Sequence, residues 1–147
     1  MSTKQVDIFK SFKQFYQLFK YKSEAMIVFD LDSLQVRDAN MAACDLLGYS
    51  NKELISLNVE HLVLYPAVTK ARIQLMAKKE EDYYSVNRHL VCKNGKIFEG
   101  HIDINNLPDY NLVVASLYDI TEERQNKEKI RKLKAAVEQN HNIIIIT

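Results

Sequence analysis

Glycine, proline and tryptophan are scarce in this sequence. Among its 147 residues there are three glycines, two prolines and no tryptophan. The three glycines, Gly48, Gly95 and Gly100, supply neither the phosphate-binding loop that ends in Lys-Ser/Thr nor the dinucleotide-binding fingerprint. Nucleotide binding through these loops is therefore excluded. A chain of this length is usually a single domain with a sizeable core.

A strong net charge, paired cysteines and long apolar runs are also missing. The 20 basic and 19 acidic residues leave a net charge of +1, so no overall field attracts nucleic acid and no such partner is expected. Cys44 and Cys92 lie on separate segments without a CxxC spacing, which fits a reducing compartment. No segment approaches the ~18 apolar residues of a membrane span, and lysines interrupt the N-terminal apolar residues that a signal peptide would need. The sequence predicts a cytoplasmic protein with no membrane span.

The N-terminal residues carry an aromatic helical pattern. Within Val6 to Tyr21, apolar residues recur at helical spacing, and lysines occupy the opposite face. This pattern predicts an amphipathic helix that docks on the domain or on a second copy of the chain. A helix lying on a membrane surface is the alternative, and the broad aromatic stripe favours a protein groove instead. The predicted dimer interface consists of Ile8, Phe12, Phe15 and Phe19.

Short strands and capped helices are predicted between residues 25 and 79. Apolar runs indicate the strands, and residues with capping side chains or a left-handed preference mark the ends of the helices. The expected elements are strands over residues 25–29 and 34–39, a short helix between Asn40 and Gly48, a second opened by the capping box of Ser50 and Glu53, and a longer one from Pro66 to about Lys79.

Two further strands, over residues 83–92 and 96–104, form a predicted hairpin. Apolar residues occupy the even positions of both strands, so their faces coincide only if the loop between them has an odd number of residues. We therefore predict a three-residue loop with Gly95 in the left-handed bulge position. This register places Arg88 on the inward face, opposite Gly100. The missing side chain at Gly100 is expected to leave room for the guanidinium or for what it binds.

The last strand, Asn111 to Ile120, is apolar on both faces. We expect the N-terminal helix to cover its outer side. Thr121 can then cap an exit helix, in which Ile130, Leu133 and Val137 follow coiled-coil spacing. This stripe is too short to form a stable coil alone, so the helix is interpreted as a connector.

The C-terminal residues resemble an earlier segment. Asn140 to Ile146 (NHNIIII) repeats the form of Ser23 to Phe29 (SEAMIVF) at an offset of 117 residues. That offset suits one domain plus a linker, so the segment is interpreted as the first strand of a second copy in a longer protein. An apolar tail is the alternative.

Four motifs in chain order resemble the PAS sensory domain family of bacterial signal transduction. They are Asn40 before a helix of small residues, LLGYSNKELI at Leu46 to Ile55, KNG at Lys93 to Gly95, and DITEER at Asp119 to Arg124. The resemblance covers about residues 21–125. It implies an α+β fold with a five-stranded antiparallel sheet, short helices on one face, an N-terminal amphipathic helix and a C-terminal exit helix. The implied units are residues 1–22 (N-terminal helix), 23–121 (PAS domain), 122–139 (signalling helix) and 140–147 (start of a second PAS domain).

The resemblance also allows the cofactor classes of the family to be compared with this sequence. Members that form a flavin adduct have a cysteine where this chain has Val59, and a glutamine where it has Leu117. Haem-binding members carry a histidine early in the long helix, where this chain has none; His61 lies earlier and is interpreted as a surface or helix-end residue. Members that bind a flavin dinucleotide usually use a tryptophan. No cofactor is identified, and a small organic ligand remains possible.

PAS-type domains bind ligands between the inner face of the sheet and the short helices, and this implies a set of pocket residues. Arg88 is the hypothesised partner of a ligand carboxylate or phosphate at the pocket mouth. An internal salt bridge, or an edge-strand arginine that extends to solvent, is the alternative. The predicted pocket residues are Ile27, Phe29, Ile73, Met76, Val86, Arg88, Leu90, Phe98, Gly100, Ile102, Ala115 and Leu117.

Neither a catalytic constellation nor a metal site is expected. His89, His101 and Asp103 share the outer face, but polar residues scatter over such a surface anyway, so no metal is predicted. No nucleophile and base stand at a recognisable spacing, and the chain is not predicted to be an enzyme.

The resemblance implies a sensory and dimerisation domain of a multidomain bacterial signalling protein. The parent would be a histidine kinase of a two-component system or a GGDEF diguanylate cyclase, which carries the enzymatic activity. Asp119, Ile120 and Thr121 are expected to transmit the signal into the exit helix. The alternative is a PAS domain without a ligand that acts only as a homodimeric spacer.

Overall fold

The computed structural model describes residues 13–146, and the side chains of residues 13–140. Residues 13–21 are helical, and the elements that follow are β1 (Ala25–Asp30), β2 (Val36–Ala39), α2 (Met41–Leu47), α3 (Asn51–Leu54), the 3-10 helix η1 (Val59–Leu62), α4 (Pro66–Lys78), β3 (Tyr83–Val91), β4 (Ile97–Leu107), the 3-10 helix η2 (Pro108–Tyr110), β5 (Leu112–Asp119) and α5 (Thr121–Ile146).

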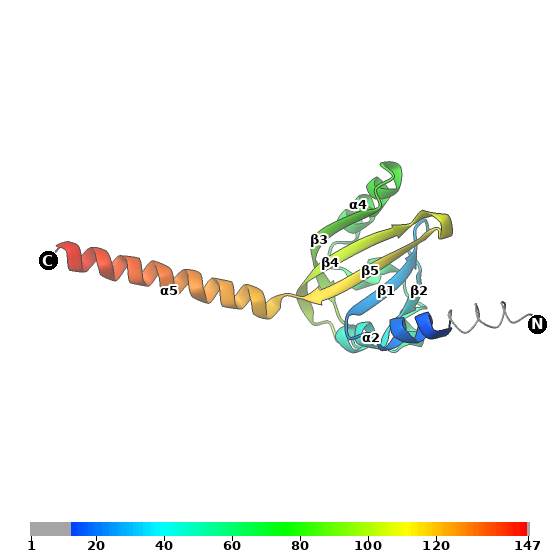
Figure 1. Ribbon diagram of the computed structural model, residues 1–147, viewed down its shortest axis with the longest axis horizontal. Coiled ribbons are helices and arrows are strands. Elements are labelled where there is room, and N and C mark those ends of the chain that lie inside the picture. The colour runs from blue at the N-terminus through cyan, green and yellow to red at the C-terminus, as the bar shows by residue number, and fades with distance from the viewer. Residues whose placement is uncertain (1–12, 147) are drawn as a thin grey trace, which may run out of the picture.

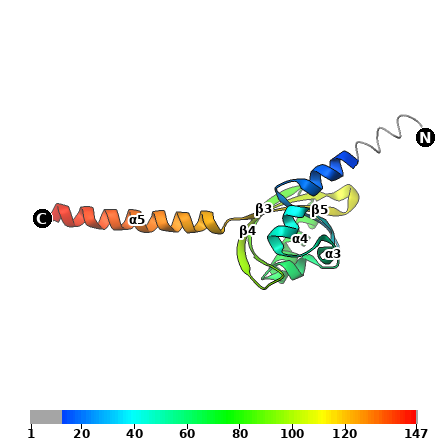
Figure 2. The ribbon, with the colours of Figure 1, turned by 90° about the horizontal axis from the view of Figure 1, so that it is seen from below.

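One antiparallel sheet organises the fold. Its strand order is β2-β1-β5-β4-β3, so β1 and β5, which are far apart in the sequence, lie side by side in the middle. The helices between β2 and β3 lie on one face of this sheet, whereas α5 extends away from it (Figure 1 and Figure 2). The predicted α+β class and five-stranded antiparallel sheet are confirmed.

Asn40 joins the start of α2 to the centre of the sheet. Its side-chain Oδ1 accepts hydrogen bonds from Ala43 N at 3.0 Å and from Met26 N at 2.9 Å, and its Nδ2 donates to Glu24 O at 2.7 Å. The residue is fully buried. Buried polar groups must be paired, and this one side chain satisfies three backbone groups from two segments. The helix predicted after Asn40 is therefore also anchored to β1.

The predicted ends of α2, the capping box of α3 and the β3–β4 turn are confirmed. Gly48 ends α2 with φ 79°, and Ser50 and Glu53 form the reciprocal capping box of α3. In the β3–β4 hairpin, Cys92 N donates to Lys96 O, which leaves a three-residue loop, and Gly95 has φ 87°. Because the loop is odd, the even positions of both strands share one face.

The core lies between this inner face and the helices. Most inward residues of the five strands are buried, and α4 contributes Thr69, Ile73 and Met76 from one side. The outer face of β5 is partly exposed in the described chain, with Tyr118 39% exposed. Residues 13–21 lie beside α2 (Figure 1). Tyr16 and Phe19 border a hollow with Met41 there. For residues 13–21 the expected packing on β5 is wrong, because Tyr16 and Phe19 lie next to the start of α2 instead.

The exit helix is longer than predicted. The structure continues α5 through Ile146, whereas the sequence indicated a strand over residues 140–147. A helix pairs its backbone groups within its own segment, while a strand needs a neighbouring strand, and the described chain offers none there. The strand is therefore corrected to helix, and the second domain stays a prediction. None of the helices in the described residues is long and apolar enough to cross a membrane.

Candidate ligand cavity

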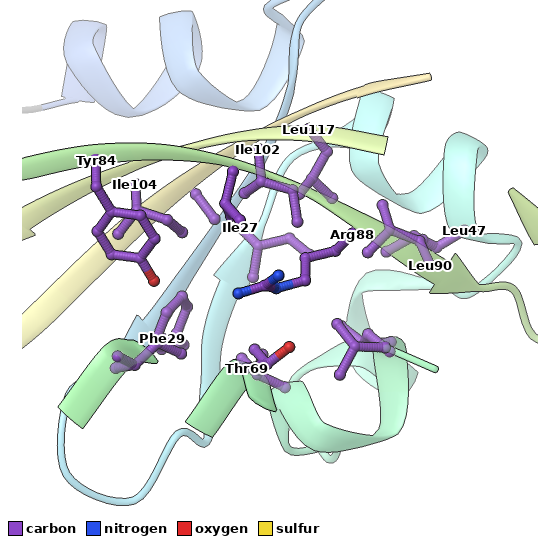
Figure 3. A pocket seen from close by; sticks show the side chains of 16 residues that line it. Ile27, Phe29, Leu47, Thr69, Tyr84, Arg88, Leu90, Ile102, Ile104 and Leu117 are labelled. Atoms are coloured by element: carbon purple, nitrogen blue, oxygen red, sulfur yellow. The ribbon is translucent and has the colours of Figure 1, made fainter. Parts of the chain in front are cut away.

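A small cavity lies between the inner face of the sheet and the helical layer (Figure 3). Its volume is about 40 Å³. The strands contribute most of its wall because their inward residues alternate, and α2, η1 and α4 close the other side. The lining residues are Ile27, Phe29, Leu47, Val59, Leu62, Val63, Thr69, Ile73, Tyr84, Val86, Arg88, Leu90, Ile102, Ile104, Ala115 and Leu117.

Nine of the predicted pocket residues line this cavity: Ile27, Phe29, Ile73, Val86, Arg88, Leu90, Ile102, Ala115 and Leu117. Three do not. Met76 is buried one turn after Ile73 and belongs to the core. Phe98 lies nearer the hairpin loop, where it borders a separate open hollow with Asp119. Gly100 is absent from the lining because another side chain covers it.

Leu90 occupies the space over Gly100. The predicted pairing of Arg88 with Gly100 is present in the strand register. A Cβ at Gly100, however, would lie 2.7 Å from Leu90 Cδ1 and 3.3 Å from Leu90 Cγ. The interpretation that Gly100 leaves room for the guanidinium or a ligand is therefore wrong. Leu90 is only 2% exposed, and it is packed into that space.

Arg88 projects from β3 into the cavity without an acidic partner. Figure 3 shows its guanidinium in the middle of the lining side chains, between the sheet and α4. Its Nε is buried and has no hydrogen-bond partner, and its Nη1 has only a marginal contact of 3.5 Å to Asn87 O. The ion pairs formed by the described side chains do not include Arg88. Within this part of the chain, Arg88 therefore does not form the internal salt bridge that was the alternative prediction.

Thr69 supplies a second unpaired polar group on the helical side. Its side chain lies on α4 facing the guanidinium, and its Oγ1 is buried with no hydrogen-bond partner. The residue is 8% exposed. A hydroxyl buried in this way costs free energy unless it is hydrogen-bonded. Two unpaired donors thus face one apolar cavity.

Tyr84 borders the cavity beside another arginine whose charge is already paired. Arg72 lies 3.8 Å from the centroid of the Tyr84 ring and forms an ion pair of 3.0 Å with Glu81. Burial raises the pKa of Tyr84, against the opposing effect of the Arg72 and Arg88 charges. Arg72 is therefore held by its own partners, and Arg88 is left as the unpaired cation of the cavity.

Several lining residues were missed by the prediction. Tyr84 and Ile104 occupy even positions, so the strand alternation could have identified them. Leu47, Val59, Leu62, Val63 and Thr69 come from helices and connections whose placement over the sheet has no local sequence signal.

The outer face of the sheet carries a polar cluster. Asp103 Oδ1 accepts from Ser85 Oγ at 2.6 Å and from Tyr83 OH at 3.1 Å, and it lies 3.1 Å from His101 Nε2. The bond from Ser85 is the main cause that holds the pKa of Asp103 below its ordinary value of 3.8, and the Tyr83 and His101 contacts add to it. His89 lies instead beside the ring of Tyr65. Within residues 13–140, no group of three His, Cys, Asp or Glu side chains is placed to hold a metal ion.

The junction of β5 and α5 is held by bonds to β4. Asp119 Oδ1 accepts from Thr121 N at 2.9 Å, and Ile120 N donates to Glu99 O at 3.1 Å. Arg124 Nη2 forms an ion pair of 2.8 Å with Glu99 Oε1. Thr121 was expected to cap the helix; it is the first helical residue, and the Asp119 carboxylate supplies the acceptor. Asp119 and Thr121 thus join the sheet to the exit helix.

The predicted interface residues are only partly described. Ile8 and Phe12 lie outside the described residues, whereas Phe15 is exposed and Phe19 is half-buried. A second apolar stripe is clearly exposed on α5: Ile130, Leu133 and Val137 are 64%, 66% and 65% exposed.

Comparison with solved structures identifies the fold. A domain of a sensory box sensor histidine kinase/response regulator from Geobacter sulfurreducens has a TM-score of 0.64 and 19% identity, over 76% of this chain and 96% of that one. The PAS domain of an HTR-like protein from Haloarcula marismortui has a TM-score of 0.67 and 16% identity, over 80% and 98%. The PAS domain of a LuxR-family transcriptional regulator from Burkholderia thailandensis, in complex with ethanol, has a TM-score of 0.62 and 14% identity, over 72% and 96%. The chain therefore has the PAS fold. No protein-family model matches its sequence.

Proposed function

We propose that this chain is a sensory and signal-transmission domain of a multidomain bacterial signalling protein, of the histidine kinase or GGDEF diguanylate cyclase type. It binds a small organic ligand in the cavity, has no catalysis of its own, and uses neither a flavin adduct nor a histidine-ligated haem. The single observation that carries the ligand-binding role is the buried Nε of Arg88, which has no hydrogen-bond partner among the described residues and belongs to a side chain that lines an apolar cavity. A buried N–H without a hydrogen-bond partner is unfavourable, and a ligand that accepts from Nε would remove this cost.

The cavity is well placed to influence α5. Leu117 and Ile102 line it as a directly opposed pair on β5 and β4, and Asp119 follows Leu117 by two residues on the same strand. A shift of these strands on ligand binding would reach the Asp119–Thr121 contact through continuous backbone. The ligand changes the output only if it binds the two arrangements of α5 with different affinity.

A homodimer would give α5 a partner for its exposed stripe. Ile130 and Val137 are seven residues apart with Leu133 between them, which places β-branched residues at position a and leucine at d of a heptad. That combination favours a parallel two-stranded coil. Phe15 and Phe19 of the N-terminal helix are the second proposed contact between the copies.

One observation favours the alternative of a homodimeric spacer without a ligand. The cavity holds only about 40 Å³, and Leu90 fills the space over Gly100. In this alternative the domain transmits or maintains the geometry of α5, and no ligand contacts Arg88.

Native mass spectrometry of the purified chain, combined with cross-linking, tests the proposal. We expect a dimer that carries a co-purified small molecule, and rapid disulfide formation in Val137→Cys under mild oxidation. Lys132→Cys, on another side of α5, is the matched control and should cross-link slowly. A ligand-free dimer would support the spacer alternative, and a monomer with no Val137→Cys cross-link would contradict both.

A further inference from the structure

We propose that the ligand of this cavity is a monocarboxylate of two or three carbons, held by Arg88 and Thr69. This inference rests on the proposed ligand-binding function and assigns its chemical class. It starts from two unpaired polar atoms, Arg88 Nε and Thr69 Oγ1, which both line one apolar cavity. Figure 3 shows them on opposite sides of the same space, one from β3 and one from α4.

The charge of the ligand follows from the charge of the wall. Arg88 brings one positive charge, and no Asp or Glu is among the lining residues. A neutral ligand would leave the guanidinium without a counter-charge, whereas a monoanion balances it. A carboxylate can accept from Nε and one Nη of the guanidinium together, and bonds of this kind are among the strongest in proteins.

A carboxylate fits the donors better than a phosphate does. Arg88 and Thr69 offer one guanidinium edge and one hydroxyl, which suit two carboxylate oxygens. A phosphate has more oxygens and a larger negative charge at neutral pH, and the remaining lining groups include only one further hydroxyl, that of Tyr84. Its other oxygens would face hydrocarbon, which is unfavourable.

The size of the ligand follows from the volume. A water molecule needs roughly 10–15 Å³ measured in this way, so a cavity of about 40 Å³ accommodates only a few non-hydrogen atoms. Acetate and propionate are the carboxylates of that size. Their methyl or ethyl groups would contact Ile27, Ile102 and Leu117, which form the apolar wall on the sheet side.

Calorimetry and thermal denaturation of the full chain test this assignment with propionate as the probe. We expect propionate to bind and raise Tm, while propionamide and 1-propanol, which have nearly the same shape without the charge, do not. Succinate and inorganic phosphate should also be without effect. Arg88→Met should weaken propionate binding at least about tenfold, and Thr69→Val about threefold. Arg37→Met, which removes an exposed arginine of β2, is the matched control and should bind as the wild type does.

A measurement on the wild-type chain keeps the test independent of variant folding. In protein labelled with ¹⁵N-arginine, the Arg88 Nε–H signal should shift as propionate is added and stay in place with propionamide. If propanol or propionamide binds as well as propionate, in wild type and Arg88→Met alike, the carboxylate assignment is overturned and the ligand-binding function stands. If none of the compounds binds and the Nε–H signal does not move, the assignment is overturned. A ligand-free dimer in native mass spectrometry would then overturn the ligand-binding function as well.

Discussion

Asp119 Oδ1 accepts a 2.9 Å hydrogen bond from the backbone amide of Thr121, across the point where β5 ends and α5 begins. The first amides of a helix have no partner within the helix, so this carboxylate satisfies one of them and lies at the favourable end of the helix dipole. Together with the bond from Ile120 N to Glu99 O, the contact holds the start of α5 at the sheet.

Asp119→Ala should therefore loosen α5 without unfolding the domain. We expect faster amide hydrogen exchange in the first turn of α5 and a loss of about 1 kcal/mol of stability, typical of a removed helix cap. Asp109→Ala, which removes an exposed carboxylate on η2, is the control. Equal exchange in the two variants would contradict a role for Asp119 in holding this junction.

Gly100→Ala should destabilise the domain because of Leu90. The new Cβ would approach Leu90 Cδ1 to 2.7 Å, and Leu90 is buried on all sides. Overpacking of this kind costs about 1–3 kcal/mol. In a Leu90→Ala background the same change should cost much less, since the crowding atoms are gone. Urea denaturation of the wild type, the two single variants and the double variant measures the coupling energy between positions 90 and 100. Additive losses of stability would show that Leu90 does not fill this space.

Asn40→Ala should cost more than the loss of an ordinary cap. The substitution removes the bond to Ala43 N and also leaves Met26 N and Glu24 O without their side-chain partner. We expect a loss of about 2–4 kcal/mol in urea denaturation. Ser50→Ala removes a cap at the exposed start of α3 and serves as the matched comparison, with a loss of about 1 kcal/mol. Similar losses in both variants would mean that the bonds of Asn40 to β1 contribute little.

The Asp103 cluster predicts a change of stability in acid. The pKa of Asp103 is lower in the folded chain than its ordinary value of 3.8, mainly because Ser85 donates to the carboxylate. The unfolded chain therefore binds more protons in this range, so the contribution is complete above pH about 5 and is lost as the pH falls through the ordinary value and then the folded value. The carboxylate is partly exposed, so the effect stays below about 1 kcal/mol.

Asp103→Asn should flatten this acid dependence. Between pH 5 and pH 3, on the scale set by ordinary carboxyl pKa values, the urea midpoint of the wild type should fall more steeply than that of the variant. Asp109→Asn removes one exposed carboxylate of η2 and should retain the wild-type slope. A variant curve parallel to the wild type would contradict the lowered pKa of Asp103.

Local features of this fold could be predicted well because neighbouring residues decide them. The ends of α2 depend on Asn40 and Gly48, and the hairpin register depends on which loop length aligns two alternating strands. The same alternation identified most of the strand residues of the cavity. In each case the physical cause lies within a few residues of the chain or in the period-two geometry of a strand.

The scarcity of glycine illustrates what the sequence by itself determined and what it did not. The scarcity of glycine excluded the nucleotide-binding loops. Gly48 and Gly95 could be assigned to left-handed positions from the sequence, because a positive φ favours glycine whatever surrounds it. The role of Gly100 depended on which side chain packs over it, and only the tertiary structure showed that this is Leu90. The position of the N-terminal helix and the unpaired atoms of Arg88 and Thr69 were likewise decided by the tertiary structure. These features depend on contacts between segments far apart in the chain, which the patterns within one segment do not specify.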